Sequence, residues 1–181
     1  MPRREQARGG MLMADFGVQV AQYVPRLRRY ALALTGDRYR ADDLVQDTLE
    51  RGWNKFHLWR PGSDLRAWLF TIMHNTFVNQ LRRGAQQDTG VPLDEQALEV
   101  PVRPAQENGL ELRDLEQALA RLPAEYREVV LLVGLESLRY EEVADVLGIP
   151  VGTVMSRLSR GREQLRRLMA GGASTGLKIV K

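Results

Sequence analysis

An irregular, acidic segment between Gly84 and Gly109 separates two stretches of sequence whose apolar residues recur at helical spacing. The segment contains three prolines and five carboxylates against one arginine, and its apolar residues show little periodicity. Proline stiffens a chain and like charges repel, so this composition is typical of an extended linker. The period-two alternation of a half-buried strand is absent from the whole sequence. The sequence therefore predicts an all-α fold, with two small helical bundles joined by a flexible acidic linker.

The apolar stripes and the residues between them predict the boundaries of the helices. Helices are predicted within 16–34, 40–56 and 65–83 before the linker, and within 112–122, 124–135 and on both sides of Gly148 after it. Gly36 is expected to end the first helix in a left-handed conformation, and Ser63 or Asp64 to cap the third. Asp42 and Asp43 are expected in the first turn of the second helix. We therefore expect a disordered tail over 1–15, a first bundle over 16–84, a linker over 85–108, a second bundle over 109–170 and a disordered tail over 171–181.

The composition narrows the kinds of site that the chain can hold. Its 181 residues include no cysteine and only two histidines, so we expect no disulfide, no metal site and no cofactor. No apolar run approaches the roughly 20 residues that a membrane span needs. No apolar core like that of a signal peptide follows the basic N-terminus. These features predict a cytoplasmic protein without membrane insertion.

Arginine supplies nearly all of the positive charge, because lysine occurs only at positions 55, 178 and 181. The planar guanidinium group donates two hydrogen bonds side by side, which suits phosphates and the edges of bases. A GC-rich genome would produce the same excess of arginine. Composition alone therefore leaves both explanations open.

The stretch 140–158 has the spacing of a helix-turn-helix motif. Such a motif needs a small residue where its two helices touch, a residue that tolerates positive φ in the turn, and a buried aliphatic residue early in the second helix. Ala144, Gly148 and Val154 meet these three requirements in order. An ordinary helical hairpin remains the alternative interpretation.

The helix that follows Gly148 has two unlike sides when it is wound at 100° per residue. Its apolar side is formed by Val151, Val154, Leu158 and Leu165, and its opposite side by Gly152, Thr153, Ser156, Ser159, Arg160 and Glu163. Small residues allow a helix to sit deeply in the major groove of DNA, where serine and arginine reach bases and phosphates. The sequence therefore predicts a DNA-reading helix, with a solvated helix face as the alternative.

The third helix of the first bundle combines aromatic residues with amides and arginines. Single-stranded DNA is held by aromatic stacking, a basic groove and polar groups that read an unstacked base. The candidate residues are Trp68, Asn75, Asn79, Arg82 and Arg83. Asn75 and Asn79 lie four residues apart and so share one helical face. The alternative is that Trp68 belongs to the core and Asn75 is an ordinary surface amide.

With both bundles in view, the chain resembles the extracytoplasmic-function sigma factors, group 4 of the sigma-70 family of bacterial RNA polymerase. The resemblance covers roughly residues 19–168. Three segments and the short linker carry it in the family's order: ADDLVQDTLERGWNKF, LRAWLFTIMHNTFVNQLRR and LPAEYREVVLLVGLESLRYEEVADVLGIPVGTVMSRLSRGRE. It implies a non-catalytic alternative sigma factor with a sigma-2 domain in the first bundle and a sigma-4 domain in the second.

The resemblance also implies a role for each surface. The residues implied to bind the β′ clamp of core RNA polymerase are Asp43, Leu44, Gln46, Asp47, Glu50 and Arg51. Those implied to bind and melt the −10 element are Trp68, Asn75, Asn79, Arg82 and Arg83, with Asn75 at a flipped-out base. Those implied to bind the −35 element are Arg139, Tyr140, Thr153, Ser156, Arg157, Ser159 and Arg160. The other implied partners are the β flap, promoter DNA and an anti-sigma factor.

The sequence departs from the family at Met155, where many relatives have lysine or arginine, and at Ser159, where some have an aromatic residue. The family's −35 sequence preference therefore does not transfer to this chain. The N-terminal segment 1–13 has no counterpart in the family.

Two other classes of protein share single features with this chain. The DDLVQD stretch resembles the magnesium site of all-α prenyl-diphosphate enzymes, but those enzymes need a second acidic cluster that this sequence lacks. A helix-turn-helix transcriptional regulator acting without being a polymerase subunit would explain the second bundle alone. No phosphorylation domain or ligand-binding sheet accompanies it in the sequence.

Overall fold

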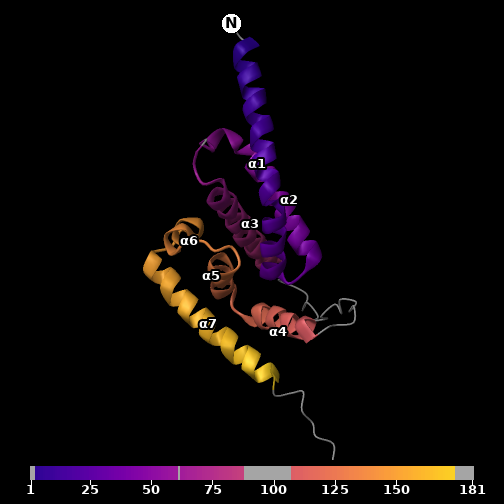
Figure 1. The fold of residues 1–181 in the computed structure, drawn as a ribbon, viewed down its shortest axis with the longest axis vertical. Helices are drawn as coiled ribbons and strands as arrows, with labels where there is room; N and C mark the ends of the chain where they lie inside the picture. The colour runs from indigo at the N-terminus through magenta and orange to yellow at the C-terminus, as the bar shows by residue number, and fades with distance from the viewer. Residues whose placement is uncertain (1–2, 61, 88–106, 174–181) are drawn as a thin grey trace, which may run out of the picture.

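The computed structural model describes the backbone of residues 3–60, 62–87 and 107–173, and the side chains of 15–60, 62–84 and 112–170. These residues form seven α-helices and one short 3-10 helix, with no strand among them (Figure 1). The elements are α1 (Arg3–Thr35), α2 (Arg38–Asn54), η1 (Phe56–Leu58), α3 (Leu65–Gln87), α4 (Glu107–Arg121), α5 (Ala124–Gly134), α6 (Tyr140–Leu147) and α7 (Val151–Ala173). The predicted all-α fold is confirmed. Most of the predicted linker lies at 88–106 and most of the predicted C-terminal tail at 174–181, outside the described residues.

The helix ends in the first bundle follow local capping chemistry. Gly36 has φ 68°, the left-handed conformation expected at the end of α1. The Asp37 side chain accepts a hydrogen bond from the Arg40 backbone N–H at 2.7 Å and caps α2. Asp42 and Asp43 therefore lie one turn further in than predicted, because the helix already begins at Arg38. Asp64, rather than Ser63, caps α3, since its Oδ1 accepts from the Ala67 backbone N–H at 3.1 Å.

Helix α1 begins at Arg3, where the sequence had suggested a disordered tail over 1–15. Nine of the thirteen residues over 3–15 are alanine, arginine, glutamine, methionine or leucine, which favour helix and outweigh the two glycines at 9 and 10. Figure 1 shows this part of α1 extending away from the two bundles.

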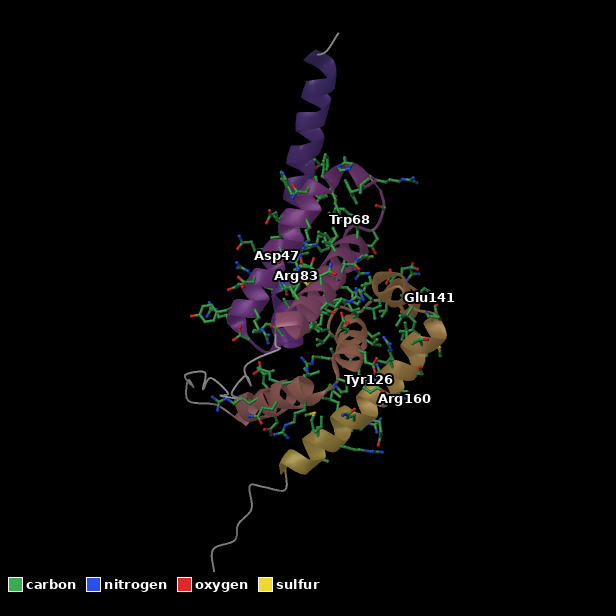
Figure 2. The ribbon with its side chains drawn as sticks, turned by 180° about the vertical axis from the view of Figure 1, so that it is seen from behind. Asp47, Trp68, Arg83, Tyr126, Glu141 and Arg160 are labelled. Carbon is green, nitrogen blue, oxygen red and sulfur yellow. The ribbon has the colours of Figure 1, made fainter. Side chains whose placement is uncertain are left out.

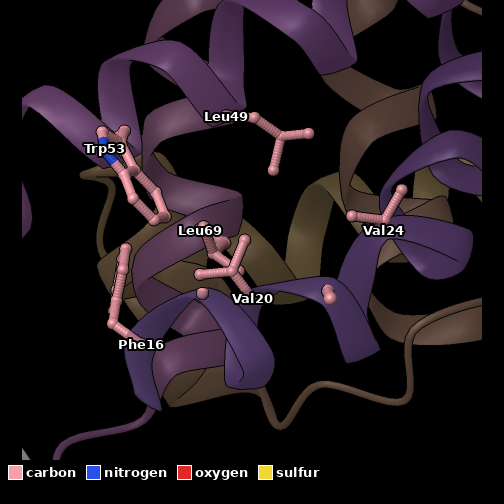
Figure 3. A pocket seen from close by; sticks show the side chains of 9 residues that line it. Phe16, Val20, Val24, Leu49, Trp53 and Leu69 are labelled. Carbon is pink, nitrogen blue, oxygen red and sulfur yellow. The ribbon is translucent and has the colours of Figure 1, made fainter. Parts of the chain in front are cut away.

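An aromatic cluster joins α1 to the rest of the first bundle. Phe16 is fully buried, and its ring lies 4.8–6.0 Å from the rings of Trp53, Phe56, Trp59 and Trp68. Beside this cluster, an apolar groove of about 240 Å³ runs between α1 and α2 (Figure 3). The cluster fixes the start of α3 and so positions the outward face of that helix.

The second bundle contains the predicted helix-turn-helix. Gly148 ends α6 with φ 64°, and the Ile149 N–H donates to the Ala144 carbonyl at 3.1 Å. Ala144 and Val154 are buried at the contact between α6 and α7. The predicted motif is therefore confirmed as a structural unit.

Helices α5 and α7 approach each other closely at Gly161. A Cβ atom at this position would lie 2.8 Å from Cγ2 of Val130 and 3.3 Å from Cβ of Tyr126. Only glycine allows the backbones to come this close, so the angle of α7 depends on this residue.

A Gly161→Ala variant is expected to lose about 1–3 kcal/mol of unfolding free energy, because the added methyl group overpacks the contact between α5 and α7. Denaturant titration followed by circular dichroism measures the loss. Gly152→Ala is the matched control on the same helix, where an added Cβ meets nothing within 4 Å. It is expected to leave stability unchanged or raise it by up to about 1 kcal/mol. Equal stability of the two variants would contradict the proposed close contact.

The two bundles pack against each other, which the sequence did not predict. Helix α1 contacts α4 and α5, and α3 contacts α6. Buried residues of both bundles form one continuous apolar core. We call this the closed arrangement. No helix in the described part of the chain is both long and apolar enough to cross a membrane.

Candidate nucleic-acid interface

The outward face of α3 carries most of the residues predicted to bind single-stranded DNA. Asn75, Asn79, Arg82 and Arg83 are all exposed. The Asn75 Nδ2 donates to the Thr71 carbonyl at 2.9 Å, which holds the side chain along the helix without burying it.

Trp68 lies on the same helix but is half-buried. Its ring packs edge-on against Phe16, with 6.0 Å between ring centroids. Part of the ring thus serves the aromatic cluster, as the alternative interpretation of the sequence required. The remaining part is accessible on the helix that carries the exposed amides.

The opposite face of α3 forms the contact with the second bundle. Arg66, half a turn around the helix from Asn75, lies 3.5 Å from Glu142 of the second bundle, and the buried Phe70 and Met73 lie on the same side of α3 as Arg66. The two faces of α3 therefore have separate tasks. The closed arrangement leaves Asn75 and Asn79 accessible to solvent.

The outward face of α7 is small, polar and basic, as predicted. Ser156, Ser159 and Arg160 are exposed, and Thr153 is half-buried. Figure 2 shows Arg160 on the side of the molecule opposite to Asp47 of α2.

Arg157 differs from the prediction that it faces DNA. Its Nη2 lies 3.2 Å from Oε2 of Glu125 on α5, and its side chain is only 29% exposed. The winding of α7 places Arg157 at the border of the apolar side, where a carboxylate from a neighbouring helix holds it. Spacing within one helix gives no signal of that partner.

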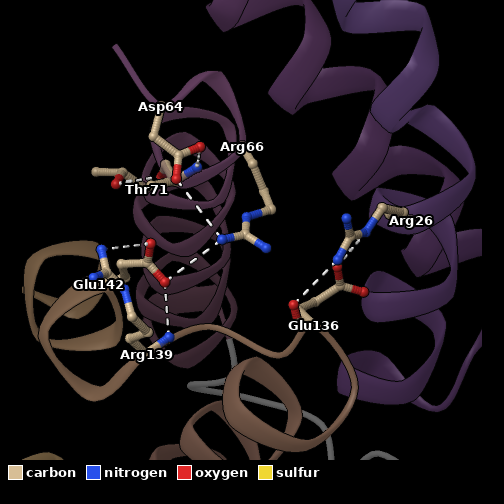
Figure 4. Close-up of polar contacts among 8 residues, drawn as sticks. Arg26, Asp64, Arg66, Thr71, Glu136, Arg139 and Glu142 are labelled. Carbon is tan, nitrogen blue, oxygen red and sulfur yellow. Dashed lines mark hydrogen bonds and ion pairs between the residues drawn. The ribbon is translucent and has the colours of Figure 1, made fainter.

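The start of α6 presents two further predicted residues. Arg139 and Tyr140 are exposed. The Arg139 backbone N–H donates to Glu142 at 2.7 Å, and its guanidinium lies 3.2 Å from the same carboxylate. Glu142 also lies 3.5 Å from Arg66 of α3 (Figure 4). These contacts, first the backbone N–H and then the guanidinium groups, hold the pKa of Glu142 below its usual value.

The outward face of α2 is acidic and contains most of the predicted polymerase-binding residues. Asp43, Gln46 and Glu50 are exposed. Asp47 and Arg51 are half-buried, and Asp47 accepts from Gln80 Nε2 at 3.1 Å. Leu44 is the exception, because it is fully buried in the core of the first bundle. The prediction that Leu44 contacts the polymerase is therefore wrong, since a side chain buried on the inner face of α2 cannot reach a partner.

No pattern in the sequence predicted the set of polar contacts that crosses the interface between the bundles. Glu136 is fully buried and accepts from Arg26 Nε at 2.8 Å (Figure 4). It also accepts from Arg29 Nη2 at 3.3 Å. Glu128, also buried, lies 2.6 Å from His74 Nδ1 of α3. We call Arg26, Arg29, Glu136, His74 and Glu128 the interface polar cluster. Its partners lie 54 to 110 residues apart in the chain, so no local pattern could reveal it.

Arg127 adds a further link between the bundles. Its guanidinium donates to the backbone carbonyl of Leu34 on α1 and to those of Ala120 and Leu122 in its own bundle. Burial lowers the pKa of Arg127 below its usual value.

Within the described residues, no group of three or more histidine, aspartate or glutamate side chains lies close enough to hold a metal ion.

Comparison with known proteins agrees with this geometry. Residues 20–74 match the family model for the sigma2 domain of PhyR, and residues 112–165 match that for sigma-70, region 4. The chain is 39% identical over 146 residues to the ECF RNA polymerase sigma factor EcfG of Rhodopseudomonas palustris, covering 81% of this chain and 80% of that protein. It is 35% identical to the ECF RNA polymerase sigma factor SigE of Mycolicibacterium smegmatis, covering 87% of this chain and 63% of that protein.

Solved structures give the same result. The sigma factor RpoE in complex with the anti-sigma factor NepR, from Bartonella quintana, is similar with a TM-score of 0.74 and 39% identity, over 86% of this chain and 97% of that chain. CnrH in complex with the cytosolic domain of CnrY is similar with a TM-score of 0.64 and 27% identity, over 89% and 96% of the two chains.

Together with the two all-α bundles and the helix-turn-helix, the matches to the sigma2 and sigma-70 region 4 families define a protein of transcription initiation. The chain belongs to the extracytoplasmic-function RNA polymerase sigma factors. It is an alternative sigma factor, a non-catalytic protein that binds core RNA polymerase and promoter DNA. The predicted family and function are confirmed, and neither the prenyl-diphosphate enzyme nor the separate regulator describes this chain.

Proposed function

We propose that the outward faces of α2, α3 and α7 bind the β′ clamp, the −10 element and the −35 element respectively. The proposal rests on one observation: each of these faces is exposed, while the opposite face of the same helix forms a core. The sigma-2 domain would span 16–84 and the sigma-4 domain 109–170, with the second bundle also meeting the β flap. The protein acts in the cytoplasm, where it meets the polymerase.

The −10 element is read in this proposal by Asn75, with Asn79, Arg82 and Arg83 on the backbone beside it. A flipped base is recognised by hydrogen bonds to its edge and by stacking against an aromatic ring. An exposed amide can both donate and accept such bonds, and the accessible part of Trp68 lies on the same helix. The acidic and amide face of α2 suits a basic partner.

The closed arrangement must open before both elements can be read together. The −10 and −35 elements are centred about 25 base pairs apart, which corresponds to roughly 85 Å of duplex at 3.4 Å per base pair. A compact chain of this length has a radius of gyration of only about 16 Å. We therefore propose that the two bundles separate on polymerase, and that polymerase then holds them at the promoter spacing so that two weak contacts act as one strong contact.

An anti-sigma factor is proposed to control this step. The support is that two similar solved structures are of sigma factors in complex with anti-sigma partners, NepR for one and CnrY for the other. Such a partner would bind the closed arrangement of this chain in preference to the form in which the two bundles are separated.

Run-off transcription sequencing with core RNA polymerase and the full chain tests the proposal. The expected result is a set of transcripts whose start sites share one −10 and one −35 sequence. Transcripts from core polymerase alone serve as the background. The proposed function would fail if adding the chain produced no promoter-specific transcript from any genomic fragment.

Arg160→Ala is expected to weaken binding of the holoenzyme to a −35 element by about 1–3 kcal/mol if the side chain reads a base. Arg157→Ala is expected to cost less, since Glu125 already holds that guanidinium. Fluorescence anisotropy with matched and altered −35 duplexes measures both. An equal loss on every −35 sequence would make Arg160 a phosphate contact instead.

A further inference from the structure

Met155 is an exposed apolar side chain on the DNA-reading helix. It is 53% exposed and is the fifth residue of α7. Its neighbours Val154 and Leu158 are buried and supply the contact with the core, so Met155 is not needed there. Met155 is thus a large apolar residue on the exposed side of the helix, which it shares with the small polar residues Ser156 and Ser159.

Met155 forms one wall of a groove of about 300 Å³ between α7 and the start of α6. The groove is lined by Tyr140, Met155, Leu158, Ser159, Arg162 and Arg166. The lining thus combines two guanidinium groups, a phenol hydroxyl and a serine hydroxyl with the apolar Met155 and Leu158, and no carboxylate is among the lining residues. The Arg166 guanidinium pairs with Glu163 of the same helix. This combination suits an anionic strand that also presents an apolar group.

In the major groove the apolar group that a base presents is the 5-methyl group of thymine. The N-terminal residues of a recognition helix contact the edges of bases, and Met155 lies among them. Methionine has a flexible, polarisable side chain that adapts its shape to a small apolar group. Lysine or arginine at this position would instead recognise the acceptors of guanine.

We propose that Met155 reads the 5-methyl group of a thymine in the −35 element, while Arg162 and Tyr140 hold the adjacent phosphates. The inference rests on the proposed function, in which α7 enters the major groove. It adds the chemical group that is read and the residue that reads it.

Replacement of thymine by deoxyuracil tests the proposal, because it removes the methyl group and nothing else. Holoenzyme made from core polymerase and the full chain is titrated against promoter duplexes that carry uracil at one −35 position at a time, on either strand. For the wild-type chain we expect uracil at one or two positions to weaken binding about fourfold, the effect of about one methyl group removed from water. Met155→Ala should bind the thymine promoter about fourfold more weakly and should no longer distinguish uracil from thymine.

Met169→Ala is the matched control. Met169 is also exposed on α7, at 37%, but lies 14 residues further along, about 21 Å at 1.5 Å per residue. This variant should keep the wild-type response to uracil. The inference is overturned if uracil has no effect at any position, or if Met155→Ala keeps the wild-type response. A holoenzyme whose binding does not change when the whole −35 element is scrambled would overturn the proposed role of α7 as well, so the two failures are distinguishable.

Discussion

An Arg26→Ala variant is expected to shift the protein from the closed arrangement toward separated bundles. Arg26 donates to both the side chain and the backbone carbonyl of Glu136, whose carboxylate is fully buried at the interface. A buried charge that loses its main partner is strongly destabilising, and here Glu136 can regain water only if the bundles part. Arg26 itself is about a third exposed and Arg29 remains nearby, so we expect the closed arrangement to lose about 2–3 kcal/mol of stability relative to the separated bundles. This loss lowers the ratio of closed to open protein roughly 30- to 150-fold.

Energy transfer between two dyes measures this change directly. The chain contains no cysteine, so cysteines introduced at the exposed positions Lys55 and Ala170 label one bundle each without competition. Arg28→Ala is the matched control, since Arg28 lies on the same helix but pairs at 3.7 Å with Asp42 of its own bundle, with both side chains more than half exposed. Arg28→Ala should change the free-energy difference between the closed and separated arrangements by no more than about 1 kcal/mol, and should leave energy transfer unchanged. Equal transfer in Arg26→Ala and wild type would contradict the proposed role of the interface polar cluster.

Asn75→Ala is expected to reduce promoter melting by about 5- to 150-fold, corresponding to the 1–3 kcal/mol of a good contact to a base edge. Binding to the −35 element should remain at the wild-type level, because α7 lies on the other bundle. Permanganate reactivity of unpaired thymines measures melting, and anisotropy with a −35 duplex measures binding. A template with an unpaired bubble at −10 should restore most of the transcription, since the strands no longer need to be separated.

Asn54→Ala is the matched control for this experiment, because Asn54 is an exposed asparagine at the end of α2. It should melt the promoter like the wild-type chain. If Asn75→Ala also melted the promoter normally, the amide would be an ordinary surface residue, as the alternative interpretation of the sequence held.

Features fixed by neighbouring residues could be predicted from the sequence. Gly36 and Gly148 have the positive φ that their positions required, and Asp64 caps α3. Ala144 and Val154 make the helix contact that their spacing indicated. Each of these depends on residues no more than about ten positions apart in the chain, so local spacing contains the necessary information.

Features that depend on a distant partner could not be predicted. Arg157 lies beside a carboxylate of α5, and Glu136 beside two arginines more than a hundred residues away. Leu44 is a different case, because the family resemblance implied a contact with the polymerase for a residue that lies on the buried, inner face of α2. The side of the helix decides what a residue can touch, even where a family resemblance is specific.

In the ion pairs between the two bundles, the first bundle supplies the positive groups and the second bundle the negative ones. Arg26, Arg29 and Arg66 come from the first bundle, and Glu136 and Glu142 from the second. When the bundles part, each of these groups must take up a small ion or water in place of its partner, so opening is an ion-uptake reaction that higher salt favours. DNA binding releases ions from the duplex and is weakened by higher salt. The two steps therefore respond to ionic strength in opposite directions, and promoter occupancy should pass through an optimum of salt concentration rather than fall steadily.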